Sequence, residues 1–312
     1  MVEPETAGSP MSERNCVRSS LRKLSRELGQ RGHAASAPTV RRLLKKHDYG
    51  LHVNSKQTET GAQHQDRDTQ FRLIEKQKQA YLRQGWPVIS VDTKKKELIG
   101  DFKNAGQVWS VAPIRVNVHD FLTAAVGKGA PYGIYDQSRN EGAVYVGTSA
   151  DTSEFAVSAI GQWWAEHGSK HYPDATHLLI LADGGGSNGY RTRLWKEQLQ
   201  SQLSDKLGLT VTVSHYPPGC SKWNPIEHRL FSYISSNWAG QPLRTFETML
   251  GYIRDTTTTT GLKVSAKLLE GIFEVGKRVA DEVMKSLNIE HNAVCGQWNY
   301  TIHPRSRAAE AT

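Results

Sequence analysis

Three acidic residues stand where carboxylates commonly take part in chemistry. Asp92 follows the mostly apolar stretch 87–91, Asp183 follows the apolar stretch 178–182, and Glu227 lies in the first turn of a predicted helix. A carboxylate at the end of a buried strand must be solvated, paired or bound to a metal, and three that converge repel one another unless cations intervene. Divalent ions prefer carboxylate oxygen and complete their coordination with phosphate, and two of them support an in-line displacement at phosphorus. The three acids therefore predict a nuclease-type centre that holds two Mg²⁺ (or Mn²⁺) ions.

Each acid also has an ordinary structural explanation. Asp92 can pair with a lysine two or four residues further on, and Asp183 can cap the glycine-rich turn that follows it. Glu227 comes three residues after Asn224, with a proline between them at the first helical position, which is the pattern of a capping box. Caps do not require the three elements to converge, so the joint placement favours catalysis.

Basic residues flank these acids. Lys94 and Lys96 follow Asp92, and Lys222 and Arg229 lie on either side of Glu227. These four side chains could neutralise or position DNA phosphates beside the acids, and solvated surface residues are the alternative explanation.

A glycine-rich turn offers a competing chemistry. Gly184, Gly186 and Gly189 satisfy the G-x-G-x-x-G pattern of a dinucleotide-binding turn, with Asp205 further along the chain. Two features count against a dinucleotide site: Asp183 would direct its charge at the pyrophosphate, and the motif falls in the second half of the chain rather than in a first βαβ unit.

Zinc is a second competitor. His215, Cys220 and His228 are types of residue that bind zinc, but their spacings match no common zinc site, and 217–219 is Pro-Pro-Gly, which is typical of a loop.

The elements that position the acids follow from the hydrophobic pattern. It predicts strands near 87–92, 107–111, 143–146, 177–182 and 209–213, and helices at 151–168, 190–207 and 225–238. Asp151 and Glu154 suit a capping box at the first of these helices. Residues 103–140 show little periodicity and are expected to be an insertion between strands. The threonine run 256–260 is expected to be a strand or a linker. This order is that of a ribonuclease-H-like α/β domain, whose mixed sheet is flanked by helices and has its first and fourth strands adjacent, so Asp92 and Asp183 should meet.

The N-terminal part has a different character. Residues 14–46 contain ten basic residues and one acidic one, so the charge of this segment exceeds the net charge of +8 of the whole chain and the remainder is close to neutral. Two short helices are predicted, at 19–30 with Leu21, Leu24 and Leu28 on one stripe, and at 39–47 with Val40, Leu43 and Leu44 inward. The basic residues of the second helix, which would contact DNA, face outward: Arg41, Arg42, Lys45 and Lys46. Together they resemble a partial helix-turn-helix.

Composition excludes several classes. The chain has 312 residues, 38% of them hydrophobic and 22% charged, which is an ordinary globular balance. No apolar run is long enough to span a membrane, and the first 15 residues have no apolar core of a signal peptide. The three cysteines are far apart, which fits a reducing cytoplasm.

Four blocks carry a resemblance to a known family. Residues 87–97, 131–136, 182–191 and 221–231 read PVISVDTKKKE, PYGIYD, ADGGGSNGYR and SKWNPIEHRLF. In order and content they resemble the ISAzo-type (Rhodopirellula-type) DDE transposases of bacterial insertion sequences, and the likeness continues to the WNYTI block at 298–302.

The resemblance implies a catalytic triad of Asp92, Asp183 and Glu227 that uses divalent metal to cleave transposon ends and join them to target DNA. It implies double-stranded DNA as partner, a homo-oligomer on that DNA, and a bacterial cytoplasmic location at the nucleoid. Family members usually carry a longer helical N-terminus, so the alternative is a truncated or decayed copy that acts only as a metal nuclease or DNA-binding protein. The predicted division is a disordered leader (1–15), a partial helix-turn-helix DNA-binding segment (16–60), a connector helix (61–85), a ribonuclease-H-like DDE catalytic domain (86–245) and a C-terminal segment (246–312).

Overall fold

The computed structural model describes residues 6–8, 15–17, 19–50 and 64–305. The chain forms two compact units, Met1–Glu59 and Thr60–Thr312, and each is described by itself. No helix in these described stretches is both long and apolar enough to cross a membrane.

The first unit contains the two predicted basic helices. Helix α1 (Leu21–Gln30) is capped by Ser20, and α2 (Ala37–Lys46) is capped by Ser36. Each cap side chain accepts a hydrogen bond from a backbone N–H in the first turn, which explains where the helices begin. Leu24 and Val40 are buried, but Leu43 is 44% exposed, so its predicted inward position is wrong.

Two short strands precede these helices. β1 (Thr6–Gly8) pairs antiparallel with β2 (Asn15–Val17). Most of this pair falls in the segment for which the sequence predicts disorder. Backbone pairing needs no apolar pattern, so periodicity could not indicate it.

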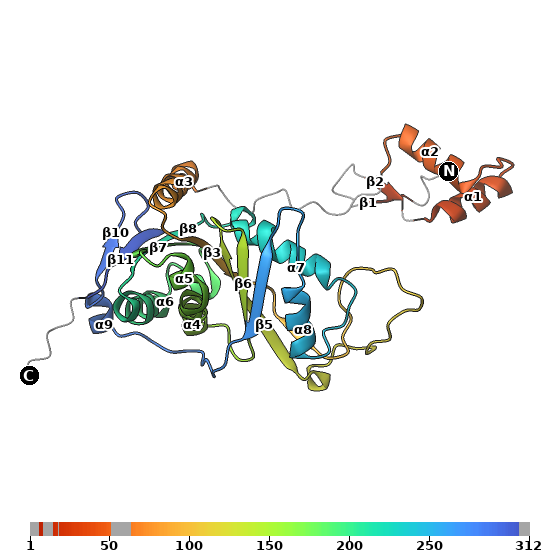
Figure 1. The fold of residues 1–312 in the computed structure, drawn as a ribbon. Coiled ribbons are helices and arrows are strands. Elements are labelled where there is room, and N and C mark those ends of the chain that lie inside the picture. The colour runs from red at the N-terminus through yellow and green to blue at the C-terminus, as the bar shows by residue number, and fades with distance from the viewer. Residues whose placement is uncertain (1–5, 9–14, 18, 51–63, 306–312) are drawn as a thin grey trace, which may run out of the picture. The chain divides into compact units, whose positions relative to one another are not determined.

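The second unit is built on one mixed sheet (Figure 1). Its strand order is β10-β11-β8-β7-β3-β5-β6-β9, with β4 paired to β5. The strands are β3 (Val88–Thr93), β4 (Glu97–Ile99), β5 (Gly127–Asp136), β6 (Glu141–Gly147), β7 (His177–Ala182), β8 (Thr210–His215), β9 (Lys263–Leu268), β10 (Ile289–His291) and β11 (Asn299–Ile302). The five strands β6-β5-β3-β7-β8 have the ribonuclease-H-like order, which confirms the predicted fold class and the adjacency of its first and fourth strands, β3 and β7.

Helices cover both faces of the sheet (Figure 1). On one face α4 (Ser153–Trp163), α6 (Arg193–Gln198) and the π-helical turn η5 (Leu199–Asp205) bury Phe155, Trp195 and Leu203 in the main core. On the other face α3 (Arg67–Arg83) packs its buried Ile74 and Tyr81 over β3 and β7. Helices α7 (Ser232–Asn237) and α8 (Phe246–Arg254) lie beyond it, over β5, β6 and β9.

Shorter helical turns complete the second unit. They are η2 (Leu122–Ala124), the π-helical η3 (Trp164–Gly168), α5 (Ser169–His171), η4 (Gly186–Asn188), η6 (Ser221–Trp223), the π-helical η7 (Glu227–Phe231) and α9 (Asp281–Lys285). Three π-helical turns interrupt the predicted helices 151–168, 190–207 and 225–238.

The second strand of the sheet is not where the sequence predicts it. Residues 107–111 form no strand, and β5 lies at Gly127–Asp136, inside the expected insertion 103–140. The threonine run 256–260 forms no strand; it connects α8 to β9, as the linker alternative predicts. Asp151 does not cap α4 either: Thr152 accepts the hydrogen bond from the Phe155 N–H.

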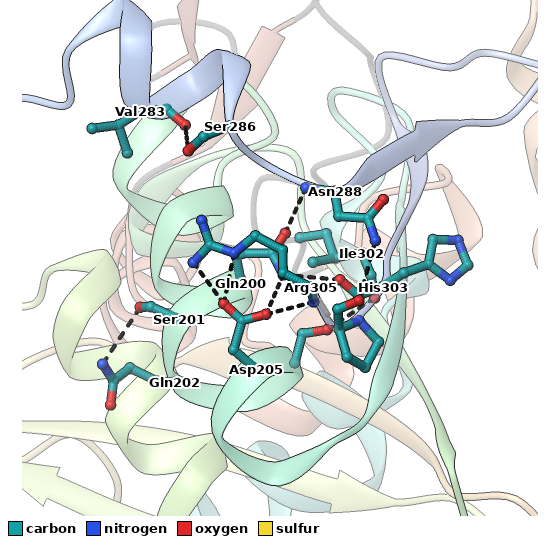
Figure 2. Close-up of polar contacts among 12 residues, drawn as sticks. Gln200, Ser201, Gln202, Asp205, Val283, Ser286, Asn288, Ile302, His303 and Arg305 are labelled. Carbon is teal, nitrogen blue, oxygen red and sulfur yellow. Dashed lines mark hydrogen bonds and ion pairs between the residues drawn. The ribbon is translucent and has the colours of Figure 1, made fainter. Parts of the chain in front are cut away.

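A polar cluster attaches the last described residues to η5 (Figure 2). The carboxylate of Asp205 accepts hydrogen bonds from the backbone N–H and the guanidinium of Arg305, at 2.6 to 2.9 Å. Gln200 donates to Asp205 and to the His303 carbonyl, and its own amide oxygen accepts from the Asn288 N–H. Residues 288–305 are therefore held to η5.

Candidate active site

Two of the predicted acids lie side by side at the carboxyl ends of adjacent strands. β3 and β7 are parallel, and their register pairs Val91 with Ala182. Asp92 and Asp183 are the next residues on the two strands, so they leave the sheet at the same edge. The Asp92 carboxylate accepts a hydrogen bond from the Thr93 N–H at 2.8 Å. It forms no ion pair with Lys94, whose ammonium lies 3.5 Å from Glu97 instead.

The third acid comes from the helical turn η7, which lies on the face of the sheet covered by α7 and α8. Glu227 begins η7, and its neighbours Ile226 and Phe231 are buried against β5. This close packing depends on Gly133, the residue opposite Asp92 in the β3–β5 ladder. A Cβ atom at Gly133 would lie 2.5 Å from Phe231 Cε1 and 2.9 Å from Ile226 Cδ1, so only glycine leaves room for the helix that carries Glu227.

The three carboxylates interact electrostatically. Burial, followed by the negative charge of Asp183, raises the pKa of Asp92 to about 8, and Glu227 and Asp151 contribute in the same direction. Burial also raises the pKa of Asp183, and Glu227 adds to it, whereas a hydrogen bond from Asn224 opposes the shift. The folded chain thus gathers anions whose repulsion a bound cation would relieve.

Asn224 does not form the predicted capping box. Its Oδ1 atom is buried and has no hydrogen-bond partner among the described residues, so it caps no N–H of the helix. Its Nδ2 group donates instead to Asp183 Oδ1 at 3.1 Å and to the Val91 carbonyl at 3.3 Å. The capping interpretation of Glu227 is therefore wrong.

Two adjoining cavities open at this edge. One, of about 540 Å³, is lined by Asp92 and Asp183 together with the glycine turn and Arg191. The other, of about 530 Å³, is lined by Glu227 and a group of cationic side chains. Ser221 lines both cavities.

The predicted basic residues differ in their surroundings. Lys94 and Lys222 line the Glu227 cavity, where burial lowers the pKa of Lys94. Lys94 also lies 4.7 Å from the centre of the Trp238 ring, so it is largely held by the protein. Lys96 and Arg229 are exposed, and Lys96 lines a separate cavity of about 350 Å³. In the first unit, Arg41, Arg42, Lys45 and Lys46 are all exposed on α2.

Hydrogen bonds from neighbouring elements hold the glycine turn, 184–189, and its surroundings do not match a dinucleotide site. Tyr132 on β5 donates a hydrogen bond to Asn188 Oδ1 at 2.9 Å, and Ser153 at the start of α4 donates to the Ser187 carbonyl at 2.7 Å. The next α-helix begins only at Arg193, so the last glycine does not open a helix. Asp205, which would bind a ribose, is occupied by Arg305 (Figure 2).

The zinc alternative finds no support either. His215 is fully buried: its Nδ1 donates to the Asp183 carbonyl at 2.9 Å, and its Nε2 accepts from the Tyr300 hydroxyl at 3.1 Å. Cys220 Sγ accepts a hydrogen bond from Arg67, and His228 Nε2 donates to the Lys222 carbonyl. Within the described residues, no three His, Cys, Asp or Glu side chains, Asp92, Asp183 and Glu227 included, already form a metal-binding cluster.

Two residues at the site were not predicted. Asp151 accepts a hydrogen bond from Thr93 at 3.1 Å and is a fourth acid near Asp92. Arg191 lines the Asp92 cavity. Its proximity in sequence to the block that contains Asp183 was a signal, whereas Asp151 reaches the site only through folding. Lys95, in the lysine run after Asp92 that the sequence indicates as a possible phosphate contact, lines the Glu227 cavity.

A ribonuclease-H-like sheet with acids at the ends of its first and fourth strands defines a class of polynucleotidyl transferases. The model of the family described as the Rhodopirellula transposase DDE domain matches residues 1–304, and the chain belongs to this family. It is therefore a DDE transposase, and the family implies the use of divalent metal.

Solved structures with a similar arrangement are transposases and a viral integration complex. The chain is similar to the Mos1 transposase paired-end complex with left transposon end, at 13% identity, with 79% of this chain and 73% of that chain covered and a TM-score of 0.43. For the Mos1 strand transfer complex the identity is 14%, the coverage 79% and 72%, and the TM-score 0.45. For a simian T-cell lymphotropic virus intasome the identity is 11%, the coverage 62% and 61%, and the TM-score 0.29. None of the curated proteins matches the sequence.

Proposed function

We propose that Asp92, Asp183 and Glu227 are the catalytic and metal-binding acids of this transposase, and that they hold two Mg²⁺ or Mn²⁺ ions. The observation that carries the proposal is their mutual repulsion at one edge of the sheet, where burial and three neighbouring acids raise the pKa of Asp92 to about 8. An arrangement that costs free energy in the absence of a cation is expected at a site that functions with one.

The donor set fits the proposed metal. Carboxylate oxygens are the ligands that Mg²⁺ and Mn²⁺ prefer. Among the described residues, no cysteine lines either cavity, and the one histidine that does, His228, is bonded to the Lys222 carbonyl. Asp92 and Asp183 would hold ions from the sheet side, and Glu227 would complete the set from η7. The bound ions would supply Lewis acidity for the attacking oxygen and charge stabilisation for the scissile phosphate.

The remaining residues of the site hold the DNA. Arg191 lines the Asp92 cavity and Lys222 lines the Glu227 cavity, so both place positive charge where a phosphodiester would bind. The basic side chains of α2, Arg41, Arg42, Lys45 and Lys46, would contact duplex phosphates. Lys96 and Arg229 are assigned the same role at the catalytic unit, and Lys94, which Glu97 and Trp238 hold in place, adds its positive charge to the Glu227 cavity.

The reaction is cleavage and strand transfer at insertion-sequence ends. Water attacks the phosphodiester at the transposon end, and the freed 3′-hydroxyl then attacks target DNA with the same in-line geometry. No covalent enzyme intermediate is needed. Both steps use double-stranded DNA, so the protein acts at the bacterial nucleoid, and joining two ends favours a homo-oligomer on the DNA.

The test is metal-dependent nicking of labelled DNA that carries the element's inverted ends. Asp183→Asn should abolish nicking with Mg²⁺ or Mn²⁺, because it removes one carboxylate of the set. Asp136→Asn is the matched control: Asp136 is also buried with a raised pKa, but it ends β5, where it pairs with Ile89 and its carboxylate accepts from the Tyr172 hydroxyl. Folded Asp136→Asn protein should nick like the parent.

Nicking by Asp183→Asn at the parental rate would overturn the triad. A folded parent that binds the DNA ends and never nicks them would instead show a DNA-binding protein. Nicking without strand transfer would show a metal nuclease.

A further inference from the structure

One buried amide touches all three elements that carry the acids. Asn224 is fully buried, and its Nδ2 group bridges the Asp183 carboxylate and the carbonyl of Val91, the residue before Asp92. Its backbone carbonyl accepts the Glu227 N–H at 3.1 Å. β3, the end of β7 and the helix of Glu227 are thus joined at a single residue.

The amide makes these contacts at the expense of its usual role. Asparagine at the start of a helix normally stabilises it by accepting a hydrogen bond from a first-turn N–H. Here Oδ1 is buried without a partner among the described residues, which is unfavourable for folding. The hydrogen bond to the charged Asp183 is favourable, so the two effects oppose each other and the amide contributes little net stability.

We infer that Asn224 is a positioning residue, whose amide fixes the orientation of the Asp183 carboxylate and its place beside Asp92 and Glu227 for metal binding. The inference rests on the proposed function, since it assigns Asn224 a role toward the same ions. Groups that orient metal ligands commonly change metal affinity 10- to 100-fold when they are removed.

The experiment measures Mn²⁺ binding by the electron paramagnetic resonance signal of free Mn²⁺, with urea unfolding of the same full-length protein. Asn224→Ala should weaken Mn²⁺ binding about tenfold or more. The urea midpoint should stay unchanged or rise, because the variant also removes an unpaired buried acceptor.

Asn299→Ala is the matched control. Asn299 is an equally buried amide, but its Nδ2 donates to Gln70 and two backbone carbonyls and its Oδ1 accepts from Gln70, so none of these partners is one of the three acids. Its removal should lower the urea midpoint and leave Mn²⁺ binding by the folded protein unchanged.

Two results would overturn the inference: parental Mn²⁺ affinity in Asn224→Ala, or loss of folding in that variant, since the inference gives the amide no net stabilising role. Asp183→Asn separates this failure from that of the proposed function. If Asp183→Asn still binds Mn²⁺ like the parent, the proposed metal site is wrong; if it loses Mn²⁺ while Asn224→Ala retains it, only the positioning role is wrong.

Discussion

Gly133→Ala tests how the helix that carries Glu227 is held against the sheet. The added Cβ would lie 2.5 Å from Phe231 Cε1, 2.7 Å from Phe231 Cζ and 2.9 Å from Ile226 Cδ1. Carbon atoms in good contact are about 3.5–4.0 Å apart, so the helix must retreat by roughly 1 Å. Both contacting side chains are buried, which leaves them little freedom to rotate away.

Two effects of different size should follow. Overpacking of this kind costs about 1–3 kcal/mol of unfolding free energy. A displacement of about 1 Å at reacting groups can lower activity about 100-fold. We therefore expect Gly133→Ala to remain folded, with a moderately lower urea midpoint and nicking reduced about 100-fold at saturating Mn²⁺.

Gly161→Ala is the control for the substitution itself. A Cβ at Gly161 would meet only Leu203 Cδ2, at an ordinary 3.6 Å, and alanine is favoured over glycine in the middle of α4. That variant should be as stable as the parent or more so, and fully active. If Gly133→Ala lost stability yet nicked at the parental rate per folded molecule, Glu227 would not depend on this packing.

Three further predictions concern charge. The Asp92 carboxylate ionises above pH about 4 in the unfolded chain but keeps its proton up to a pH of about 8 in the folded protein. Without metal, the stability of the parent therefore falls as pH rises through this window. Asp92→Asn should gain thermal stability relative to the parent at pH 8 but not at pH 4. Lys222→Ala should weaken DNA binding similarly for all sequences and lower the slope of log affinity against log salt by about 1, measured by fluorescence anisotropy; an unchanged slope would place it outside the phosphate contacts. Arg305→Ala should cost at most about 1 kcal/mol in urea unfolding, because its ion pair with Asp205 is partly exposed, and it should leave nicking intact.

β3, β7 and the acids that follow them could be predicted because the hydrophobic pattern of the sequence agrees with the burial of the side chains. The apolar residues of β3 and β7 are fully buried, so their sequence pattern directly reports the core, and the position of Asp92 and Asp183 follows from where the apolar runs end. Their pairing side by side needed only the order of elements along the chain.

β5 could not be predicted because tertiary packing overrides its local preferences. Gly129 and Gly133 weaken the strand signal, yet both are required by close neighbours: a Cβ at Gly129 would lie 2.8 Å from Met249 Sδ. The stretch 107–111 shows the opposite error: a strand was predicted there, but it forms none, and its apolar residues Trp109 and Val111 are fully exposed.

The departures from local rules gather around the acids. Asn224 leaves its capping position unused, Gly133 stands in the middle of a central strand, and Glu227 begins a π-helical turn rather than a regular helix. Each is unfavourable or neutral for folding when considered alone. All three act on the contact between the helix of Glu227 and the ends of β3 and β7, and local rules of folding are most often broken where a functional site requires it, so they support a functional role for the placement of these carboxylates.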